Sequence, residues 1–225
     1  MTPQEKNFKM PAEWVRHERT FMAWPVSQEQ WPDDYETVCR AYASVARAIS
    51  GFEPVTMIAR PELAGHAANL CGPSVDILLM EHDDAWLRDN GPTFVVNGEG
   101  QVAGISWHFN GWGGKFSPWE TDDLVAARLL SHLKLDCFQA PIVLEGGSIH
   151  VDGEGTLLTT EECLLNRNRN PHWSRAEMEK VLQQYLGISK IIWLKRGLYG
   201  DHTDGHVDNV ACFARPGLVL VQACY

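Results

Sequence analysis

Two similar segments indicate a repeated structural unit: Asn-Gly-Glu-Gly-Gln-Val at residues 97–102 and, 55 residues later, Asp-Gly-Glu-Gly-Thr-Leu at residues 152–157. Each segment predicts a β-hairpin, because Asn-Gly and Asp-Gly favour the positive φ angles of tight turns and strand-forming residues flank them. A degenerate third copy, Arg-Pro-Gly-Leu-Val-Leu, lies at residues 215–220 and puts Gly217 where the earlier copies have Gly100 and Gly155. Such repetition predicts a fold built from copies of one unit.

A helix and then a strand are expected after each of the first two hairpins. Apolar residues recur at helical spacing over residues 124–133, after a capping Thr121 or Asp122. They recur again over residues 178–186, where Ser174 and Glu177 form a capping-box pattern. Short apolar strands are predicted at residues 137–143 and 190–194. The repeated unit is therefore strand, strand, helix, strand.

An earlier copy of the unit is predicted near the N-terminus, with a strand at residues 20–24, a helix at 34–50 and a strand at 55–59. We expect one incomplete α/β domain, residues 1–225, with units at roughly 11–80, 81–143, 144–197 and a partial unit at 198–225. A partial unit leaves an open sheet edge, so the chain is expected to be truncated or completed by a partner. The predicted buried stripe of the 34–50 helix is Tyr35, Val38, Tyr42, Val45 and Ile49.

Composition narrows the class of protein. A net charge of -10 argues against nucleic acid as a partner, because phosphate binding needs clustered Lys and Arg. Apolar runs stay well short of the ~20 residues that span a bilayer, and the N-terminus has no signal-peptide pattern. The six cysteines are scattered without a Cys-x-x-Cys pair, which indicates free thiols and a cytoplasmic location.

Ionisable residues open successive hairpins at equivalent positions. Asp89 stands before the first hairpin, Glu145 before the second, and His206 with Asp208 before the third. If the units surround an axis, these groups should meet there, and the adjacent glycines allow close approach. Glu145 is the most telling, since Glu is a poor turn residue whereas Asp before Asn-Gly-Pro is an ordinary turn former.

Two chemistries fit these residues. Asp204, His206 and Asp208 would share one face of a strand and could bind a metal ion. Alternatively, carboxylates grip a planar guanidinium cation while a histidine moves protons, and Trp86 could stack on that cation. Metal-ligand spacings of the familiar kinds do not occur, which favours cation binding.

Four motifs carry a family resemblance, and together they are specific. They are Trp-Leu-Arg-Asp-Asn-Gly-Pro at residues 86–92, Asn-Gly-Trp-Gly-Gly-Lys at 110–115, Leu-Glu-Gly-Gly-Ser-Ile-His at 144–150 and Thr-Asp-Gly-His-Val-Asp-Asn at 203–209. In this order they resemble the agmatine deiminases, in the family that includes bacterial-type peptidylarginine deiminases. The similarity runs from about residue 11 to the end.

The resemblance implies a pentein-type α/β propeller of five units, of which this chain would hold about three and a half. It implies a hydrolase acting on C–N bonds of linear amidines, converting agmatine to N-carbamoylputrescine and ammonia in polyamine biosynthesis, without metal or cofactor. By their motifs, Asp89 and Asp208 would bind the guanidinium, Glu145 would assist, His206 would be the general acid and base, and Trp86 would form a pocket wall. A homo-oligomer is a family-level expectation.

Two departures from the family pattern stand out. Family members attack the guanidinium carbon with a cysteine in a Gly-rich segment near the C-terminus, and none of the six cysteines here matches it, Cys224 included. The chain as given is therefore expected to lack turnover. His202 occupies a position that is commonly acidic, so the substrate preference stays open. The alternatives are an arginine or peptidylarginine deiminase, an amidinotransferase, a non-catalytic guanidine-binding or assembly protein and, last, a metal-dependent hydrolase.

Overall fold

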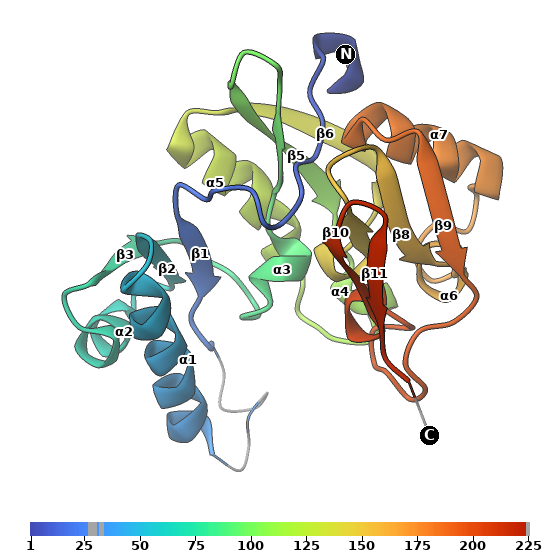
Figure 1. Cartoon of the computed structure of the whole chain (residues 1–225). Helices are drawn as coiled ribbons and strands as arrows, with labels where there is room; N and C mark the ends of the chain where they lie inside the picture. Colours follow the sequence, from blue (N-terminus) through green and yellow to red (C-terminus); the bar gives the residue numbers. More distant parts are fainter. Residues whose placement is uncertain (27–30, 32–33, 224–225) are drawn as a thin grey trace. The chain divides into compact units, whose positions relative to one another are not determined.

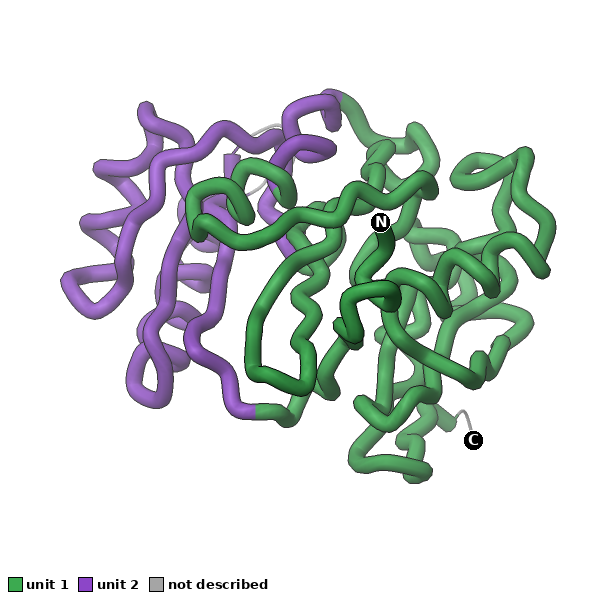
Figure 2. The backbone as a smooth tube through the Cα atoms, turned by 90° about the horizontal axis from the view of Figure 1, so that it is seen from above, with its two compact units in different colours: residues 1–15, 88–117, 126–225 green, residues 16–87, 118–125 purple. Residues whose placement is uncertain are grey.

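The computed structural model describes residues 1–26, 31 and 34–223, and these form two compact units (Figure 2). Unit 1 consists of Met1–Val15, Arg88–Ser117 and Ala126–Tyr225, and unit 2 of Arg16–Leu87 and Pro118–Val125. The hairpins that define the repeat, and most of the candidate site residues, belong to unit 1.

Unit 2 is a parallel sheet with connecting helices. The sheet order is β1 (Thr20–Ala23), β2 (Val55–Ala59), β3 (Val75–Leu79), with α1 (Tyr35–Ser50) and α2 (Ala64–Cys71) in the connections. The strands predicted at residues 20–24 and 55–59 and the helix at 34–50 are confirmed. The sequence pattern did not indicate α2 or β3. Their apolar residues are too few to establish a period, and Gly72 sits between them.

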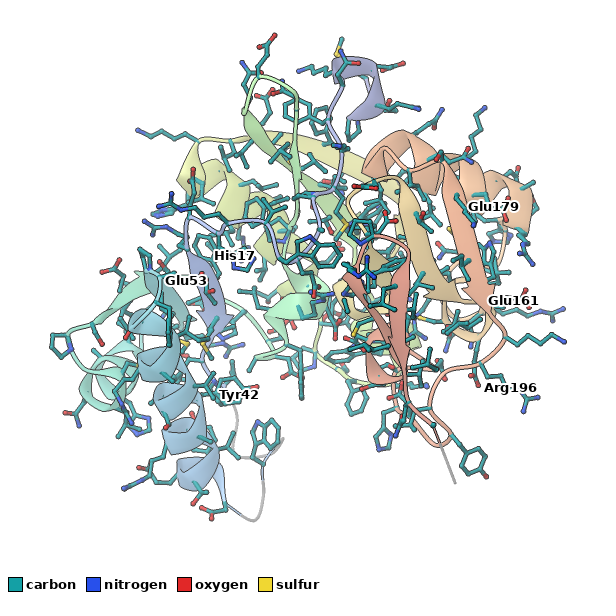
Figure 3. All side chains as sticks on the ribbon, viewed as in Figure 1. His17, Tyr42, Glu53, Glu161, Glu179 and Arg196 are labelled. Carbon is teal, nitrogen blue, oxygen red and sulfur yellow. The ribbon has the colours of Figure 1, made fainter. Side chains whose placement is uncertain are left out.

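The buried face of α1 differs from the predicted stripe. Small side chains are fully buried at Cys39, Ala43 and Ala46, whereas Val45 is 50% exposed. Small residues let the helix axis lie close to the sheet, so the larger Tyr42, marked in Figure 3, packs at the edge of the core. The helix begins where predicted, because the Asp34 carboxylate accepts the N–H of Thr37.

Unit 1 contains the predicted strand-strand-helix-strand motif twice (Figure 1). In both copies the first two strands pair antiparallel and the third joins the second in parallel. The first copy is β4 (Thr93–Val96), β5 (Val102–His108), α5 (Val125–Leu133) and β6 (Asp136–Val143). The second is β7 (Ile149–Val151), β8 (Thr156–Thr160), α7 (Arg175–Leu186) and β9 (Lys190–Leu194).

The two copies share one apolar core, to which β5, β6 and α7 contribute many side chains. The capping box of Ser174 and Glu177 is present, and the buried residues of α7 are those predicted. In α5 the predicted stripe of Leu124, Ala127, Leu130 and Leu133 is confirmed only at Leu130, which is fully buried. Leu124 belongs to a preceding 3-10 turn, η2 (Asp122–Leu124), and is 46% exposed, while Leu129 is buried instead. Arg175 joins Glu179 of α7 to Glu161 of the neighbouring short helix, both marked in Figure 3.

The third hairpin is formed by β10 (Ala211–Arg215) and β11 (Leu218–Val221), with Gly217 at φ 71° in its turn. It lies beside β7, where the N–H of Phe213 donates to Nδ1 of His150 at 3.3 Å. The positive φ angles in the earlier turns fall at Gly100, Gly153 and Gly155. The expectation for the Asn-Gly pair at 97–98 was therefore wrong: the Asn side chain accepts backbone N–H groups instead. Cys224 lies outside the described residues.

No helix within the described residues has the length and apolar character needed to cross a bilayer.

Short helical turns lie next to the hairpins of unit 1, and several of them contain candidate site residues. The short turns are η1 (Gln4–Lys6), α3 (Leu87–Asn90), α4 (Gly111–Gly114), η3 (Gly146–Ser148), α6 (Glu161–Leu164) and η4 (Val207–Asn209).

Candidate functional site

Three of the predicted site residues converge within unit 1. Asp89 stands four residues before β4, Glu145 four before β7 and His206 five before β10. Nδ1 of His206 lies 3.8 Å from Oδ1 of Asp89, and its Nε2 lies 3.9 Å from Oε2 of Glu145. All three residues are at least nine-tenths buried. Equivalent positions of successive repeats therefore meet, with the imidazole between two carboxylates.

Gly147 marks the centre of this cluster. A Cβ built on it would lie 2.4 Å from Nδ1 of His206, 2.7 Å from Oδ2 of Asp208 and 2.9 Å from Oδ1 of Asp89. Real Cβ atoms do not tolerate such contacts, so the three groups surround a space that only glycine leaves open. The backbone N–H of Gly147 also donates to Oδ1 of Asp89 at 3.0 Å.

The other two predicted site residues lie differently. Asp208, in η4, directs a carboxylate oxygen to the same point beside Gly147 but remains exposed to solvent. Trp86 belongs to unit 2, where 47% of its surface is exposed. Its role as a pocket wall stays a prediction.

Trp112 is a site residue that sequence reasoning missed. Its Nε1–H donates to Oδ2 of Asp89 at 3.0 Å, in the buried interior. The backbone of Trp112 is left-handed (φ 54°, ψ 48°), an uncommon conformation for a large residue that stores strain. Asn110 supports the turn by accepting the N–H of Gly113 at 2.8 Å. The sequence did contain a signal for this residue, since Trp112 lies between two glycines in the motif at residues 110–115. The sequence analysis gave that tryptophan no role.

Arg169 is the second missed residue. Its Nε donates to Oε1 of Glu145 at 2.8 Å, with both side chains 0% exposed. Its Nη1 bonds Oδ2 of Asp204 at 2.6 Å, and its Nη2 bonds the carbonyl of Thr203 at 2.8 Å. One guanidinium thus ties Glu145 to the loop that carries His206. Within the polar run Asn-Arg-Asn-Arg-Asn at residues 166–170 no pattern distinguished it from an exposed arginine.

The loop before His206 is not a strand, which corrects one expectation. Asp204 is left-handed (φ 62°) and faces Arg169, Lys115 and Asn168, while His206 precedes the turn η4. The two-residue strand period therefore does not apply, and Asp204 does not share a face with His206. Asp201 organises the loop instead, since its carboxylate accepts the backbone N–H groups of residues 203, 205 and 206.

Burial and neighbouring charges act in opposite directions on the pKa values of Glu145 and His206. Burial, with the nearby charge of Glu145, raises the pKa of the Asp89 carboxyl, although His206 partly offsets it. Burial alone would raise the pKa of Glu145, but the adjacent His206 and the charge of Arg169 hold it below its usual value. Burial would likewise lower the pKa of His206, yet Glu145 and Asp89 raise it. The site thus favours a protonated imidazole beside an ionised Glu145.

Cys163 is a third residue that the sequence did not single out. It belongs to α6, is fully buried, and its Sγ lies 3.9 Å from Oε2 of Glu145. Burial and the adjacent Glu145 charge raise the pKa of the thiol well above its usual value. A thiol that remains protonated is a weak nucleophile, so Cys163 is not poised to attack a bound carbon.

Comparison with known proteins gives concordant matches. The family model of Porphyromonas-type peptidyl-arginine deiminases matches residues 9–225. The chain is 51% identical to an agmatine deiminase of Stutzerimonas stutzeri over 227 residues and 50% identical to one of Pseudomonas aeruginosa over 226 residues; each alignment covers 98% of this chain and 61% of the relative.

Solved structures agree with these matches. The agmatine deiminase of Enterococcus faecalis superposes with a TM-score of 0.94 at 41% identity, covering 97% of this chain and 61% of that one. A cysteine-to-serine variant of C. jejuni agmatine deiminase with substrate bound gives 0.86 at 31% identity, covering 94% and 63%. The predicted fold class, the pentein-type α/β fold of these enzymes, is confirmed.

The matched region has a defined extent. The chain spans about three-fifths of the length of the relatives it matches. Within that extent the family model covers nearly all of the sequence, and the site described above lies inside it. The chain therefore belongs to the family of Porphyromonas-type peptidyl-arginine deiminases, whose solved members include agmatine deiminases.

Proposed function

We propose that this chain supplies the guanidinium-binding and acid–base part of an agmatine deiminase, which hydrolyses agmatine to N-carbamoylputrescine and ammonia. The observation that carries the proposal is the convergence of Asp89, His206 and Asp208 around the side-chain-free position of Gly147. The high identity to bacterial agmatine deiminases supports the choice of substrate.

Asp89 and Asp208 bind the guanidinium in this proposal. A guanidinium is flat and offers several N–H donors in a fixed fork, which carboxylates match with charge-assisted hydrogen bonds. Two hydrogen bonds orient the Asp89 carboxylate: Oδ2 accepts the Trp112 Nε1–H, and Oδ1 accepts the Gly147 N–H. Burial raises the pKa of Asp89, because a buried carboxylate loses its hydration. A bound guanidinium cation favours the ionised form and therefore offsets part of this desolvation penalty.

His206 is the general acid and base, and Glu145 acts on it. The Oε1 atom of Glu145 is taken by Arg169, while Oε2 faces Nε2 of His206. Glu145 is also 0% exposed, which favours orienting the imidazole over gripping the substrate directly. Nδ1 of His206, on the side of Asp89 and Gly147, is then the atom that exchanges protons with substrate.

The reaction requires a nucleophile, which in this family is a cysteine thiolate. Its sulfur bonds to the guanidinium carbon, a C–N bond breaks, and the leaving nitrogen takes a proton from His206 to depart as ammonia. Water then attacks the thiouronium carbon and gives one proton to His206. As the C–S bond breaks, the sulfur leaves as thiolate and the remaining hydroxyl proton passes to solvent, which releases the ureido product. Cys163 does not fit this step, because its thiol is buried and its pKa is raised.

The test separates binding from turnover. Isothermal titration of the 225-residue chain with agmatine should give binding that the His206→Ala variant largely retains. Ammonia release should then be measured with the product of the gene's whole reading frame, with and without a chelator. Chelator-resistant release from agmatine supports the proposal, whereas chelator-sensitive release indicates a metal hydrolase, and absence of agmatine binding refutes it.

A non-catalytic guanidine-binding role is the second candidate, favoured by the buried, protonated state of Cys163 beside the site. It predicts binding without turnover in every length of the protein. Turnover of free arginine or an arginyl peptide in preference to agmatine would instead indicate another deiminase, and transfer of the amidino group to an amine would indicate an amidinotransferase.

We further propose a reducing, cytoplasmic location. The five described cysteines are all free, and three of them, Cys39, Cys71 and Cys163, are buried. Assembly into a homo-oligomer stays a family-level prediction, to be tested by light scattering.

A further inference from the structure

Three side chains with metal-binding atoms meet behind the proposed substrate position. Among the residues that the structure describes, Glu145, Cys163 and His206 form a group whose ligand atoms all lie within 4.8 Å of one another. All three residues are buried, and they come from the separate segments that precede η3, form α6 and precede η4. One carboxylate oxygen, one sulfur and one imidazole nitrogen thus face a common point.

A second observation points to a ligand there. In the described residues, Nε2 of His206 is buried and has no hydrogen-bond partner, because Oε2 of Glu145 stands 3.9 Å away, beyond hydrogen-bond reach. Oε2 of Glu145 accepts a long hydrogen bond from the Cys163 thiol, whose Sγ lies 3.9 Å away, while Arg169 binds the other oxygen. A buried polar atom without a partner is rare and costly, so a ligand that bonds Nε2 of His206 would stabilise this arrangement.

We propose that Glu145, Cys163 and His206 form a binding site for Zn²⁺, which would compete with the use of His206 in acid–base chemistry. Thiolate, imidazole and carboxylate are the three ligand types that zinc takes in proteins. Three protein ligands leave a fourth tetrahedral position for water, the arrangement of open zinc sites. The proposal concerns binding and does not depend on the proposed function.

The ligand atoms lie somewhat farther apart than in a zinc-loaded site. At zinc–ligand lengths of about 2.0 to 2.3 Å, tetrahedral ligand atoms lie roughly 3.3 to 3.7 Å apart. Oε2 of Glu145 lies 3.9 Å from Cys163 Sγ and 3.9 Å from Nε2 of His206, and all three ligand atoms lie within 4.8 Å of one another. Glu145 must therefore approach the other two by a few tenths of an ångström, and Cys163 and His206 must approach each other by up to about 1 Å. Oε1 can keep its bond to Arg169 during this movement, because a carboxylate bridges readily through its two oxygens.

Charge and proton balance also fit. Binding displaces the thiol proton of Cys163 and, when His206 is protonated, the Nε2 proton, and both pass to the buffer. The ion's double charge is matched by the Cys163 thiolate and the Glu145 carboxylate, while Asp204 continues to neutralise Arg169. Affinity should therefore rise with pH, as it does wherever ligands must lose protons.

Cobalt(II) tests the site directly, since it occupies zinc sites and its bond to a thiolate absorbs in the near ultraviolet. Titration of the reduced 225-residue chain with Co²⁺ should give this band with one equivalent, and Zn²⁺ should abolish it. The Cys163→Ser variant should lose the band and bind Co²⁺ more than about 100-fold more weakly, because even outer-shell changes cost roughly 10- to 100-fold in affinity. The matched control is Cys137→Ser, which alters an exposed cysteine and should leave the band unchanged.

X-ray absorption of the zinc-loaded wild-type chain reads the ligands without any variant, so failure of Cys163→Ser to fold does not weaken the test. One sulfur and three nitrogen or oxygen neighbours support the proposal. Equal Co²⁺ bands in the wild type and the Cys163→Ser variant, a shell of oxygen alone, or no stoichiometric binding would each overturn it. Because no readout involves agmatine, failure here leaves the proposed function untouched.

Discussion

Arg169 donates from Nε to Oε1 of Glu145 at 2.8 Å, and neither side chain is exposed to solvent. A guanidinium of the protein itself therefore occupies one oxygen of the carboxylate whose other oxygen faces Nε2 of His206. The same arginine binds Asp204 and the Thr203 carbonyl, so it connects the Glu145 segment to the loop ahead of His206. We interpret Arg169 as the residue that sets the distance between Glu145 and His206.

Replacing Arg169 with methionine should destabilise the fold. The change leaves Glu145 as an unpaired buried carboxylate, and breaking one partner of a buried pair costs about 3 to 5 kcal/mol. Chemical denaturation of the wild type and the variant measures the difference. Arg167→Met is the matched control, because Arg167 is exposed in the same loop and its change should stay within about 0.5 kcal/mol. Equal losses in both variants would mean that Arg169 has no special role.

Gly147→Ala should disturb three groups at once. The added methyl would lie within 3 Å of His206, Asp208 and Asp89, and such overpacking costs about 1 to 3 kcal/mol. Agmatine binding, measured by titration calorimetry, should be lost because the methyl fills the position around which the carboxylates converge. Gly98→Ala is the control, since nothing lies within 4 Å of its Cβ position. Unimpaired agmatine binding by Gly147→Ala would contradict the proposed substrate position.

Much of the architecture followed from local pattern. The hairpins, α7 with its capping box, and the strands of unit 1 were predictable because turn glycines, caps and apolar periodicity are encoded within a few residues. The buried stripes of α1 and α5 were not, because which face of a helix is buried depends on the sheet it meets. The repeat also indicated that Asp89, Glu145 and His206 would converge, since equivalent positions of repeated units occupy equivalent places.

The residues that contact Glu145 from other segments were not predicted from the sequence. Arg169 lies in a polar loop and Cys163 in a short helix, and only the tertiary structure brings both to Glu145. Asp204 was assigned to the wrong face because its left-handed backbone breaks the strand period. Arg169 and Cys163 lie 24 and 18 residues from Glu145 in the chain, and contacts between such separate segments do not produce a periodic pattern in a single sequence.

His206 should titrate above the ordinary histidine value. Glu145 and Asp89 raise its pKa despite burial, which on its own would lower it. A raised pKa in the folded state means that protonated His206 stabilises the fold. This contribution is fully present below the unfolded value of 6.5 and is lost as pH rises through the folded pKa. NMR titration of the imidazole measures the shift, and the Asp89→Asn variant should reduce it. A folded pKa at or below 6.5 would contradict the geometry.

Asp89→Asn should chiefly weaken binding of the substrate cation. A hydrogen bond to a charged group contributes about 1.5 to 3 kcal/mol, so the agmatine dissociation constant should rise roughly 10- to 150-fold. The pH dependence gives a second signature. Because burial raises the pKa of Asp89, wild-type affinity should fall as pH decreases through that pKa, where the carboxylate takes up a proton and loses its charge. The variant lacks the Asp89 step and should retain only the step of Asp208, whose pKa burial also raises. Asp76→Asn, at an exposed position of β3, is the control and should match the wild type in both respects. If Asp89→Asn binds agmatine as tightly as the wild type across the pH range, Asp89 does not contact the guanidinium, and Asp208 would have to bind it alone.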